Sequence, residues 1–363
     1  MYHYLLKPSD VLSFRDGKPF GSAEEHNIIL DFPPSPATFY GALRSSVLAV
    51  GVDHLDGLGA MTDELKTIIG APGKPGALEI KSLLFHHQEK GFLFPAPTDL
   101  VKKKKTAPEQ KTVLHRMILK ELPGDAQFNF PEGITKILEP ENDIFVEGVD
   151  GYLTLPGLTK YLTGDVPADE ELLGTGDVYV TENRVGIGRS NATRTVKPGA
   201  LFTIEFARLQ NKISFYAELS HKPGTKSIKL GGEGRTCSVE PIESRMELHF
   251  NEMRAPNGIK VIIVTPLCSE KGWYPDDLMQ KKLEEATGTT LQLKAAAIKR
   301  HRSIGGWDIV LNRPKTMRRY IPEGSVFYFS SEKQLSIKPR LFNLSSSEDE
   351  KKQGFGLTLL GGF

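Results

Sequence analysis

The sequence predicts an α+β protein with antiparallel sheets, made of two halves that share one order of elements. In each half a strand and a helix precede two strands, and a glycine-rich turn then leads to a final strand. The chain has 363 residues, more than one compact core usually serves, so two domains are expected. The order resembles the split β-α-β arrangement of ferredoxin-like (RRM-like) folds, with the second helix short or lost. We therefore predict ferredoxin-like domains at 1–245 and 246–363, the first with an insertion at about 52–180.

The first half opens with a strand at 2–7 and a helix at 37–50. Ser35 suits the N-cap position, Pro36 suits the first helical position, and apolar residues then recur at helical spacing. The insertion is rich in glycine and proline, so we expect it to be largely irregular. After it, segments that alternate apolar and polar side chains predict antiparallel strands, which lead into the turn LGGEGR.

The second half repeats this order with little residue identity to the first. An apolar run at 259–268 predicts a strand, and 276–286 predicts a helix with an acidic first turn. Two further strands are expected within 291–310 and 316–330, and the glycine-rich, apolar end at 353–363 predicts the last strand.

Composition excludes several classes of protein. The apolar fraction of 39% and the charged fraction of 25% are ordinary for a globular domain. The first residues lack the apolar stretch of a signal peptide, and no apolar run is long enough to span a bilayer. Cys237 and Cys268 are too few for a disulfide framework and form no metal-ligand pair. We expect a cytoplasmic protein that needs no membrane, metal or cofactor.

The net charge of +1 is small for a protein that grips nucleic acid alone, so any such contact must use local clusters of cations. Acidic residues gather elsewhere and suit protein partners. The acidic segments are 165–177, 270–285 and 348–350. The basic clusters are Lys102 to Lys105, 184–197, 299–302 and 315–319.

The glycine-rich turn, three of these basic clusters and Arg44 of the predicted helix at 37–50 supply the candidates for nucleic-acid contact. Glycines allow a backbone to approach a phosphate closely, and Arg235 adds a two-donor clamp. Arginines spaced along a loop suit successive phosphates of one strand. An ordinary β-turn and a solvated hairpin tip remain the alternatives for these two features. The candidates are Arg44, Arg184, Arg189, Arg194, Lys197, Gly231, Gly232, Gly234, Arg235, Lys299, Arg300, Arg302, Arg318 and Arg319.

Two aromatic or titratable side chains have competing interpretations. Trp307 follows a basic stretch and suits base stacking, but tryptophan is highly buried on average, so we expect it in the core. His26 lies in a loop where a general base is conceivable, yet it has no positioned partner. No phosphate-loop or nucleophile-elbow motif is present, and we expect no enzymatic activity.

Several segments together resemble a known family. They are LKPSDVLSFRDGKPF, SPATFYGALRSS, LGGEGR, KRHRSIGGWDIVLNRPKTMRRYIPEGSVFYF and GFGLTLLG, in this order. The chain is similar in them to the third Cmr subunit of type III-B CRISPR effector complexes, of the RAMP superfamily. The resemblance implies a non-catalytic subunit of an antiviral, RNA-guided complex. It also implies a role in holding the 5′ tag of the guide RNA and in contacting the large polymerase-like subunit and a backbone subunit.

Two rival functions remain at this stage. Related RAMP proteins that process guide RNA are thought to use histidine, which would make His26 the base of an endoribonuclease. A purely structural scaffold that touches no RNA agrees with the small net charge.

Overall fold

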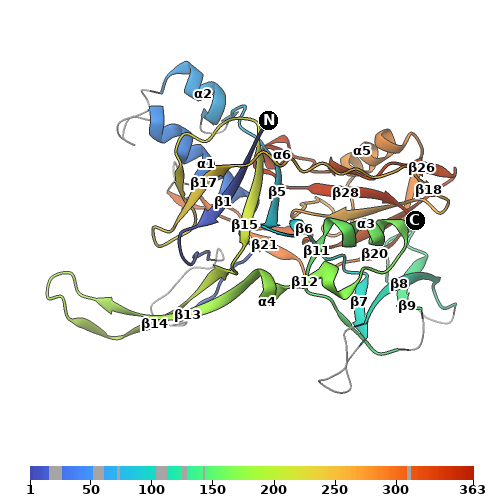
Figure 1. The fold of residues 1–363 in the computed structure, drawn as a ribbon, viewed down its shortest axis with the longest axis horizontal. Helices are drawn as coiled ribbons and strands as arrows, with labels where there is room; N and C mark the ends of the chain where they lie inside the picture. Colours follow the sequence, from blue (N-terminus) through green and yellow to red (C-terminus); the bar gives the residue numbers. More distant parts are fainter. Residues whose placement is uncertain are drawn as a thin grey trace. The chain divides into compact units, whose positions relative to one another are not determined.

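The computed structural model describes most of the chain (Figure 1). The chain divides into two compact units. Unit 1 comprises 1–88, 176–244 and 303–318, and unit 2 comprises 89–175, 245–302 and 319–363. The described residues are 1–15, 27–51, 61–71, 74–103, 113–124, 129–141, 144–308 and 312–363.

Unit 1 contains a sheet whose strands follow the order β5-β15-β1-β17-β16, with every neighbouring pair antiparallel. Counting along the chain, β1 is the first strand, α1 follows it, and β5, β15 and β17 are the second, third and fourth strands. Read across the sheet from β5 to β17, the strands are therefore the second, third, first and fourth along the chain. The elements are β1 (Tyr2–Pro8), α1 (Pro36–Gly51), β5 (Ile80–His87), β15 (Ile213–Leu219), β16 (Ser227–Lys229) and β17 (Thr236–Pro241).

The core of unit 1 forms where α1 packs on this sheet. Phe39 and Leu43 lie one helical turn apart and are both buried, as their spacing predicts. The Phe39 ring packs edge-on against the Phe215 ring of β15, with the ring centres 4.9 Å apart. The Phe85 ring of β5 stacks on the Phe215 ring, with the ring centres 5.1 Å apart. Helix and sheet are thus joined by aromatic side chains, which bury large apolar areas.

A long antiparallel hairpin also belongs to unit 1 (Figure 1). It consists of β13 (Tyr179–Arg189) and β14 (Val196–Leu209). No residue of β13 is buried, and apolar side chains such as Val185, 69% exposed, face solvent. The strand β14 also pairs in parallel with β2 (Asn27–Ile28), so the hairpin belongs to a three-stranded sheet.

The other elements of unit 1 are short. They are β2 (Asn27–Ile28), α2 (Asp63–Ile69), β3 (Gly70–Ala71), β4 (Lys74–Pro75), β22 (Trp307–Asp308) and β23 (Arg313–Pro314). Three elements lie at the chain positions where the units change, namely α4 (Thr175–Val178), β21 (Arg302–Ile304) and β24 (Arg318–Tyr320).

Unit 2 contains an antiparallel sheet with the same chain-to-space order, β20-β25-β19-β28-β27. Along the chain, β19 comes first, α5 follows it, β20 and β25 are next, and α6 precedes β28. Asp276 caps α5, its carboxylate accepting the Met279 amide at 3.0 Å. The elements are β19 (Ile259–Ile263), α5 (Asp277–Thr287), β20 (Leu291–Ala297), β25 (Val326–Ser331), β27 (Arg340–Asn343), α6 (Glu348–Gln353) and β28 (Leu357–Gly362).

Alternate residues of these strands build the core of unit 2. Val261, Phe327 and Leu360 come from neighbouring strands and pack with Met279 and Leu283 of α5. The remaining strands of unit 2 form smaller groups, β12-β11-β6, β10-β7-β8-β9 and β18-β26. These elements are β6 (Gly91–Pro95), β7 (Leu100–Lys103), β8 (Leu114–Glu121), β9 (Lys136–Pro140), β10 (Val146–Gly148), β11 (Gly151–Thr154), α3 (Leu155–Thr163), a 3-10 turn (Asp169–Glu171), β12 (Leu172–Gly174), β18 (Met253–Ala255) and β26 (Leu335–Ile337).

The organisation differs from the sequence-based expectation in the insertion. The expected insertion at 52–180 contains β5, a strand of the unit 1 sheet, and the described residues of 89–175 form strands and a helix that group with unit 2. Most of these strands are only three to five residues long and are separated by glycines and prolines. Such short segments show little periodicity, because a pattern needs several repeats before it is recognisable.

Candidate nucleic-acid interface

Three arginines of unit 1 converge on one carboxylate at the base of the hairpin. Asp10, just after β1, accepts Arg208 at 3.0 Å and Arg235 at 3.1 Å, and Arg184 lies 3.6 Å away. The pKa of the Asp10 carboxyl is lowered, first by the hydrogen bond from the Val11 amide and then by Arg208 and Arg184. Asp10 is therefore ionised at neutral pH and orients all three guanidinium groups.

An aromatic ring and a second carboxylate complete this base cluster. The guanidinium carbons of Arg184 and Arg235 lie 5.1 and 5.0 Å from the centre of the buried Phe206 ring. Glu182 binds Arg208 and, at 3.2 Å, Arg184. Three guanidinium groups against two carboxylates leave one net positive charge, 3 − 2 = +1. The cluster is preorganised and remains cationic.

The glycine-rich turn lies between β16 and β17 and packs on the segment after β1. A Cβ on Gly231, where φ is +83°, would stand 2.4 Å from the Ser13 carbonyl oxygen. The Gly232 amide donates to that carbonyl at 2.8 Å, and the Arg235 amide donates to Gly232 O at 3.2 Å. The Gly232 amide is thus used inside the fold, which removes one donor from the phosphate cradle that the sequence suggested.

Alanine substitutions at Gly231 and Gly234 should separate two contributions to the loss of unfolding free energy, namely backbone strain at positive φ and a steric clash of the added Cβ with Ser13. Gly231→Ala and Gly234→Ala both place a side chain at positive φ, which costs about 1–2 kcal/mol. Only Gly231→Ala adds a clash with Ser13, because a Cβ on Gly234 meets open space. Urea unfolding should show a clearly larger loss of unfolding free energy for Gly231→Ala. Equal losses would contradict the packing role of Gly231.

The tip of the hairpin carries a second, separate group of arginines. Arg189 and Arg194 are exposed on either side of a turn closed by the Arg194 amide donating to Ser190 O at 2.8 Å. Arg189 is five residues beyond Arg184 on β13, a distance of about 17 Å along a strand. Arg235 at the base and Arg189 at the tip therefore belong to separate groups and do not share one phosphate site. Lys197 lies in β14, but its side chain is outside the described part of the structure.

A polar groove adjoins the base cluster in unit 1. Its volume is about 700 Å³, and its lining includes Lys7, Asp10, Arg208 and Lys212. His86 also lines it, and the pKa of this imidazole is lowered by burial and then by His87 and Lys7. The cations beside this groove suit the backbone of a single strand.

Three of the other candidates contact neighbours inside the fold. Lys299 binds Asp150 at 2.6 Å, and Arg302 binds Glu323 at 2.6 Å, both in unit 2. Arg44 on α1 lies over the Tyr40 ring with its guanidinium carbon 5.9 Å from the centre. Arg300, Arg318 and Arg319 are exposed at the surface.

The prediction for Trp307 is wrong, because its side chain is 55% exposed on a two-residue strand. So short a strand buries neither face. In the basic stretch of β7, Lys102 pairs with Glu147 at 3.3 Å. His26, Lys104 and Lys105 lie outside the described residues.

Sequence reasoning missed four members of the base cluster, namely Asp10, Glu182, Phe206 and Arg208. Asp10 lies inside the segment LKPSDVLSFRDGKPF, but nothing local marks it as an arginine ligand. Within the described ranges, no group of three metal-ligating side chains occurs and no helix is long and apolar enough to cross a bilayer. Cys237 and Cys268 are buried, the Cys268 thiol donates to the Arg319 carbonyl oxygen at 3.6 Å, and burial raises the pKa of Cys237 to about 12.

Comparison with known proteins identifies the family. A chain in the cryo-EM structure of the type III-B Cmr-beta bound to cognate target RNA is 15% identical in sequence, with a TM-score of 0.50. The match covers 91% of this protein and 86% of the chain in that structure. A chain of the same assembly bound to cognate target RNA and AMPPnP, state 1, is 16% identical, with coverages of 90% and 85% and a TM-score of 0.49. A chain of the Csm3-Csm4 subcomplex of the type III-A interference complex is 13% identical over 100% of both, with a TM-score of 0.40.

The first of these likenesses indicates a shared fold. No curated protein matches the sequence. A family model described as CRISPR-associated protein (Cas_Cmr3) matches residues 4–362. Since this match spans nearly the whole sequence, the chain belongs to the Cas_Cmr3 family of CRISPR-associated proteins.

Proposed function

We propose that this protein is a non-catalytic RNA-binding subunit of a type III-B CRISPR effector complex. In this role it holds the 5′ tag of the guide RNA and contacts the large polymerase-like subunit and a backbone subunit. The observation that carries the proposal is the hairpin of unit 1, which presents exposed arginines at its tip and a preorganised, net cationic cluster at its base.

The two ends of the hairpin supply different contacts with RNA. The base cluster offers guanidinium groups already fixed by Asp10, so little side-chain freedom is lost when a phosphate binds. Arg189 and Arg194 at the tip are exposed and suit successive phosphates of the same strand. The groove beside Lys7 and Arg208 would continue the path.

Protein partners would use the apolar residues of the same hairpin. Val185, Ile187, Val196 and Leu201 are about half exposed or more, an unusual number for one hairpin. A partner subunit that covers them would stabilise the hairpin and thereby fix the tip arginines. The solved type III-B assembly with a similar chain is bound to target RNA, which agrees with such a setting.

We also infer that each unit is built on a ferredoxin-like half. The support is the order of strands in space, second, third, first and fourth, which recurs in both sheets with a helix after the first strand. This is the arrangement of the β-α-β-β-α-β motif. Its second helix is the short α6 in unit 2, and no helix stands between β15 and β17 in the described residues of unit 1.

The tip arginines provide the test of RNA binding. The double variant Arg189→Ala/Arg194→Ala should bind a labelled single-stranded RNA bearing a guide 5′ end about tenfold or more weakly at moderate salt. Its plot of log affinity against log salt should lose about 1.4 from its slope, because each single-strand phosphate contact contributes about 0.7. The measurement is fluorescence anisotropy with the full chain, repeated as guide-RNA recovery from the assembled complex.

The matched control removes two exposed lysines of unit 2. Lys333→Ala/Lys338→Ala changes the net charge equally, so it isolates position from charge. A purely structural scaffold is the second candidate, favoured by the pairing of Arg184, Arg208 and Arg235 with carboxylates. If both double variants bind RNA and recover guide RNA equally well, the scaffold function replaces the RNA-binding one.

A further inference from the structure

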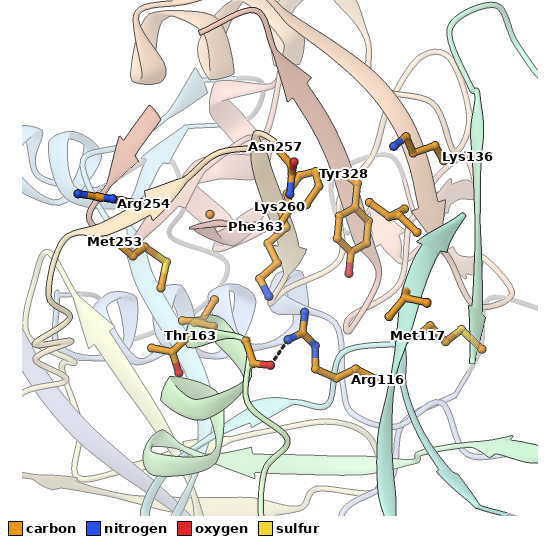
Figure 2. Close-up of a pocket in the computed structure, with 15 residues that line it drawn as sticks. Arg116, Met117, Lys136, Thr163, Met253, Arg254, Asn257, Lys260, Tyr328 and Phe363 are labelled. Carbon is orange, nitrogen blue, oxygen red and sulfur yellow. Dashed lines mark hydrogen bonds between the residues drawn. The ribbon is translucent and has the colours of Figure 1, made fainter. Parts of the chain in front are cut away.

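A second cationic site lies in unit 2, apart from the residues assigned to RNA above. It is a cavity of about 690 Å³, a size typical of small-molecule sites (Figure 2). Four cations line it and no carboxylate does. Its lining residues are Arg116, Met117, Ile118, Leu119, Lys136, Leu162, Thr163, Gly164, Met253, Arg254, Asn257, Lys260, Tyr328, Gly362 and Phe363.

Lys260 is the innermost of these cations. It interrupts the apolar strand β19, is 1% exposed, and donates from Nζ to the Tyr161 carbonyl oxygen at 3.1 Å. The same nitrogen lies 4.0 Å from the centre of the Tyr161 ring. In the described ranges no carboxylate lies within ion-pair distance of Nζ. Two of its three donor positions therefore remain for a ligand.

Arg116 of β8 faces Lys260 across the cavity, and the ends of the two side chains point toward one another in Figure 2. Its Nη1 donates to the Gly164 carbonyl oxygen. Its Nε is buried and has no hydrogen-bond partner among the described residues. Guanidinium groups present a planar fork that matches the oxygens of a phosphate.

The protein supplies one anion for the buried Lys260 and the half-buried Arg116. Asp99 is fully buried, and its carboxylate accepts the hydroxyls of Tyr161 and Tyr328. When the Lys260 amine is protonated, these two cations and one carboxylate leave an excess of one positive charge beside the buried Nζ. Burying an excess charge is unfavourable unless a counter-ion joins it. Burial and then Arg116 lower the pKa of Lys260 to about 7, which agrees with a missing anion.

The other residues that line the cavity indicate which chemical groups the rest of a ligand would carry. Met117, Met253 and Phe363 supply apolar surface, and Phe363 packs edge-on against Tyr328 at 5.0 Å. Asn257 adds an amide, which can both donate and accept hydrogen bonds. A phosphate beside a flat ring combines the two chemistries that this cavity offers.

We propose that this cavity binds the phosphate group of a nucleotide-sized ligand between Lys260 and Arg116. The phosphate belongs either to a free mononucleotide or to a nucleotide of an RNA strand. In both cases Lys260 and Arg116 hold its oxygens, and the apolar rim contacts the base. The site is independent of the hairpin of unit 1.

Calorimetric titration of the full chain tests this site, with AMP and adenosine as probes and a short single-stranded RNA as a separate arm. Lys260→Met and Arg116→Gln should each weaken binding at least tenfold. The matched controls are Lys333→Met and Arg340→Gln, which change exposed cations elsewhere in unit 2 and should bind as the wild type does. Thermal unfolding of every variant checks that the fold is retained.

The arms distinguish the sources of the phosphate. Loss of AMP binding in both cavity variants supports a free nucleotide, and loss confined to the RNA arm supports an RNA nucleotide. Equal binding of adenosine and AMP overturns the proposal, since the phosphate would then contribute nothing. It is overturned equally if neither AMP nor the RNA binds, or if the cavity variants bind both ligands as the controls do.

Discussion

Asp99→Ala is expected to destabilise the protein by about 3–5 kcal/mol, as the removal of one partner from a buried charged network does. Asp99 is fully buried, and its carboxylate accepts the Tyr161 hydroxyl at 2.8 and 2.9 Å and also the Tyr328 hydroxyl. Alanine leaves both hydroxyls without this acceptor and leaves Lys260 and Arg116 without their nearest anion. The free energy of unfolding in urea, measured at pH 7, checks the loss.

Two further variants define the cause of this loss. Asp99→Asn keeps an acceptor oxygen but removes the charge, so it should fall between the wild type and Asp99→Ala. Asp169→Ala removes an exposed carboxylate of unit 2 and should change stability by less than about 0.5 kcal/mol. A loss below about 1 kcal/mol for Asp99→Ala would show that the network is not needed for folding.

Lys260→Met should have the opposite effect and stabilise the protein at pH 6. Burial lowers the pKa of Lys260 from 10.5 to about 7, and each pKa unit corresponds to about 1.4 kcal/mol, so the charged form carries a cost of several kcal/mol. Methionine has similar length and no charge. The groups that face Lys260 are Arg116 on β8, Asp99 before β7, Tyr161 on α3 and Tyr328 on β25.

The stabilisation should depend on pH in one direction. Between about pH 7 and 10.5 the unfolded chain keeps the Lys260 proton while the folded chain has lost it, so wild-type stability gains as pH rises. The advantage of Lys260→Met is therefore largest below pH 7 and shrinks toward pH 10. Burial and then Asp99 raise the pKa of Tyr161 and Tyr328, so both hydroxyls stay neutral across this range. A constant difference between the two proteins at every pH would contradict this account.

Local patterns were sufficient to predict many elements. The helix at 37–50 and the burial of Phe39 follow from capping and helical spacing, and α1 occupies Pro36–Gly51. The acidic first turn predicts the start of a helix near Asp276, and Asp276 is the N-cap of α5. These features depend on residues a few positions apart, which is why sequence alone reveals them.

The arginine candidates show the limit of such patterns. Charge clustering pointed to Arg184 and the glycine-rich turn pointed to Arg235, and both guanidinium groups lie beside the Phe206 ring. The same clustering also selected Lys299 and Arg302, which pair with Asp150 and Glu323 in the fold. A run of cations records no information about carboxylates far along the chain, so pairing cannot be predicted from it.

The sequence alone predicted β1, α1, α5 and β28 and indicated the family, because periodicity, capping and the segments shared with the family are local properties of the chain. It did not predict that β5 joins the first sheet, since Ile80–His87 lies in the expected insertion. Only the tertiary structure decided that residues 89–175 group with unit 2, and that Asp10 gathers three arginines. The same holds for Lys260, a single lysine in an apolar strand that becomes a buried cation facing Arg116. The physical reason is that ion pairing and desolvation depend on distances in space between residues as far as 225 positions apart in the chain.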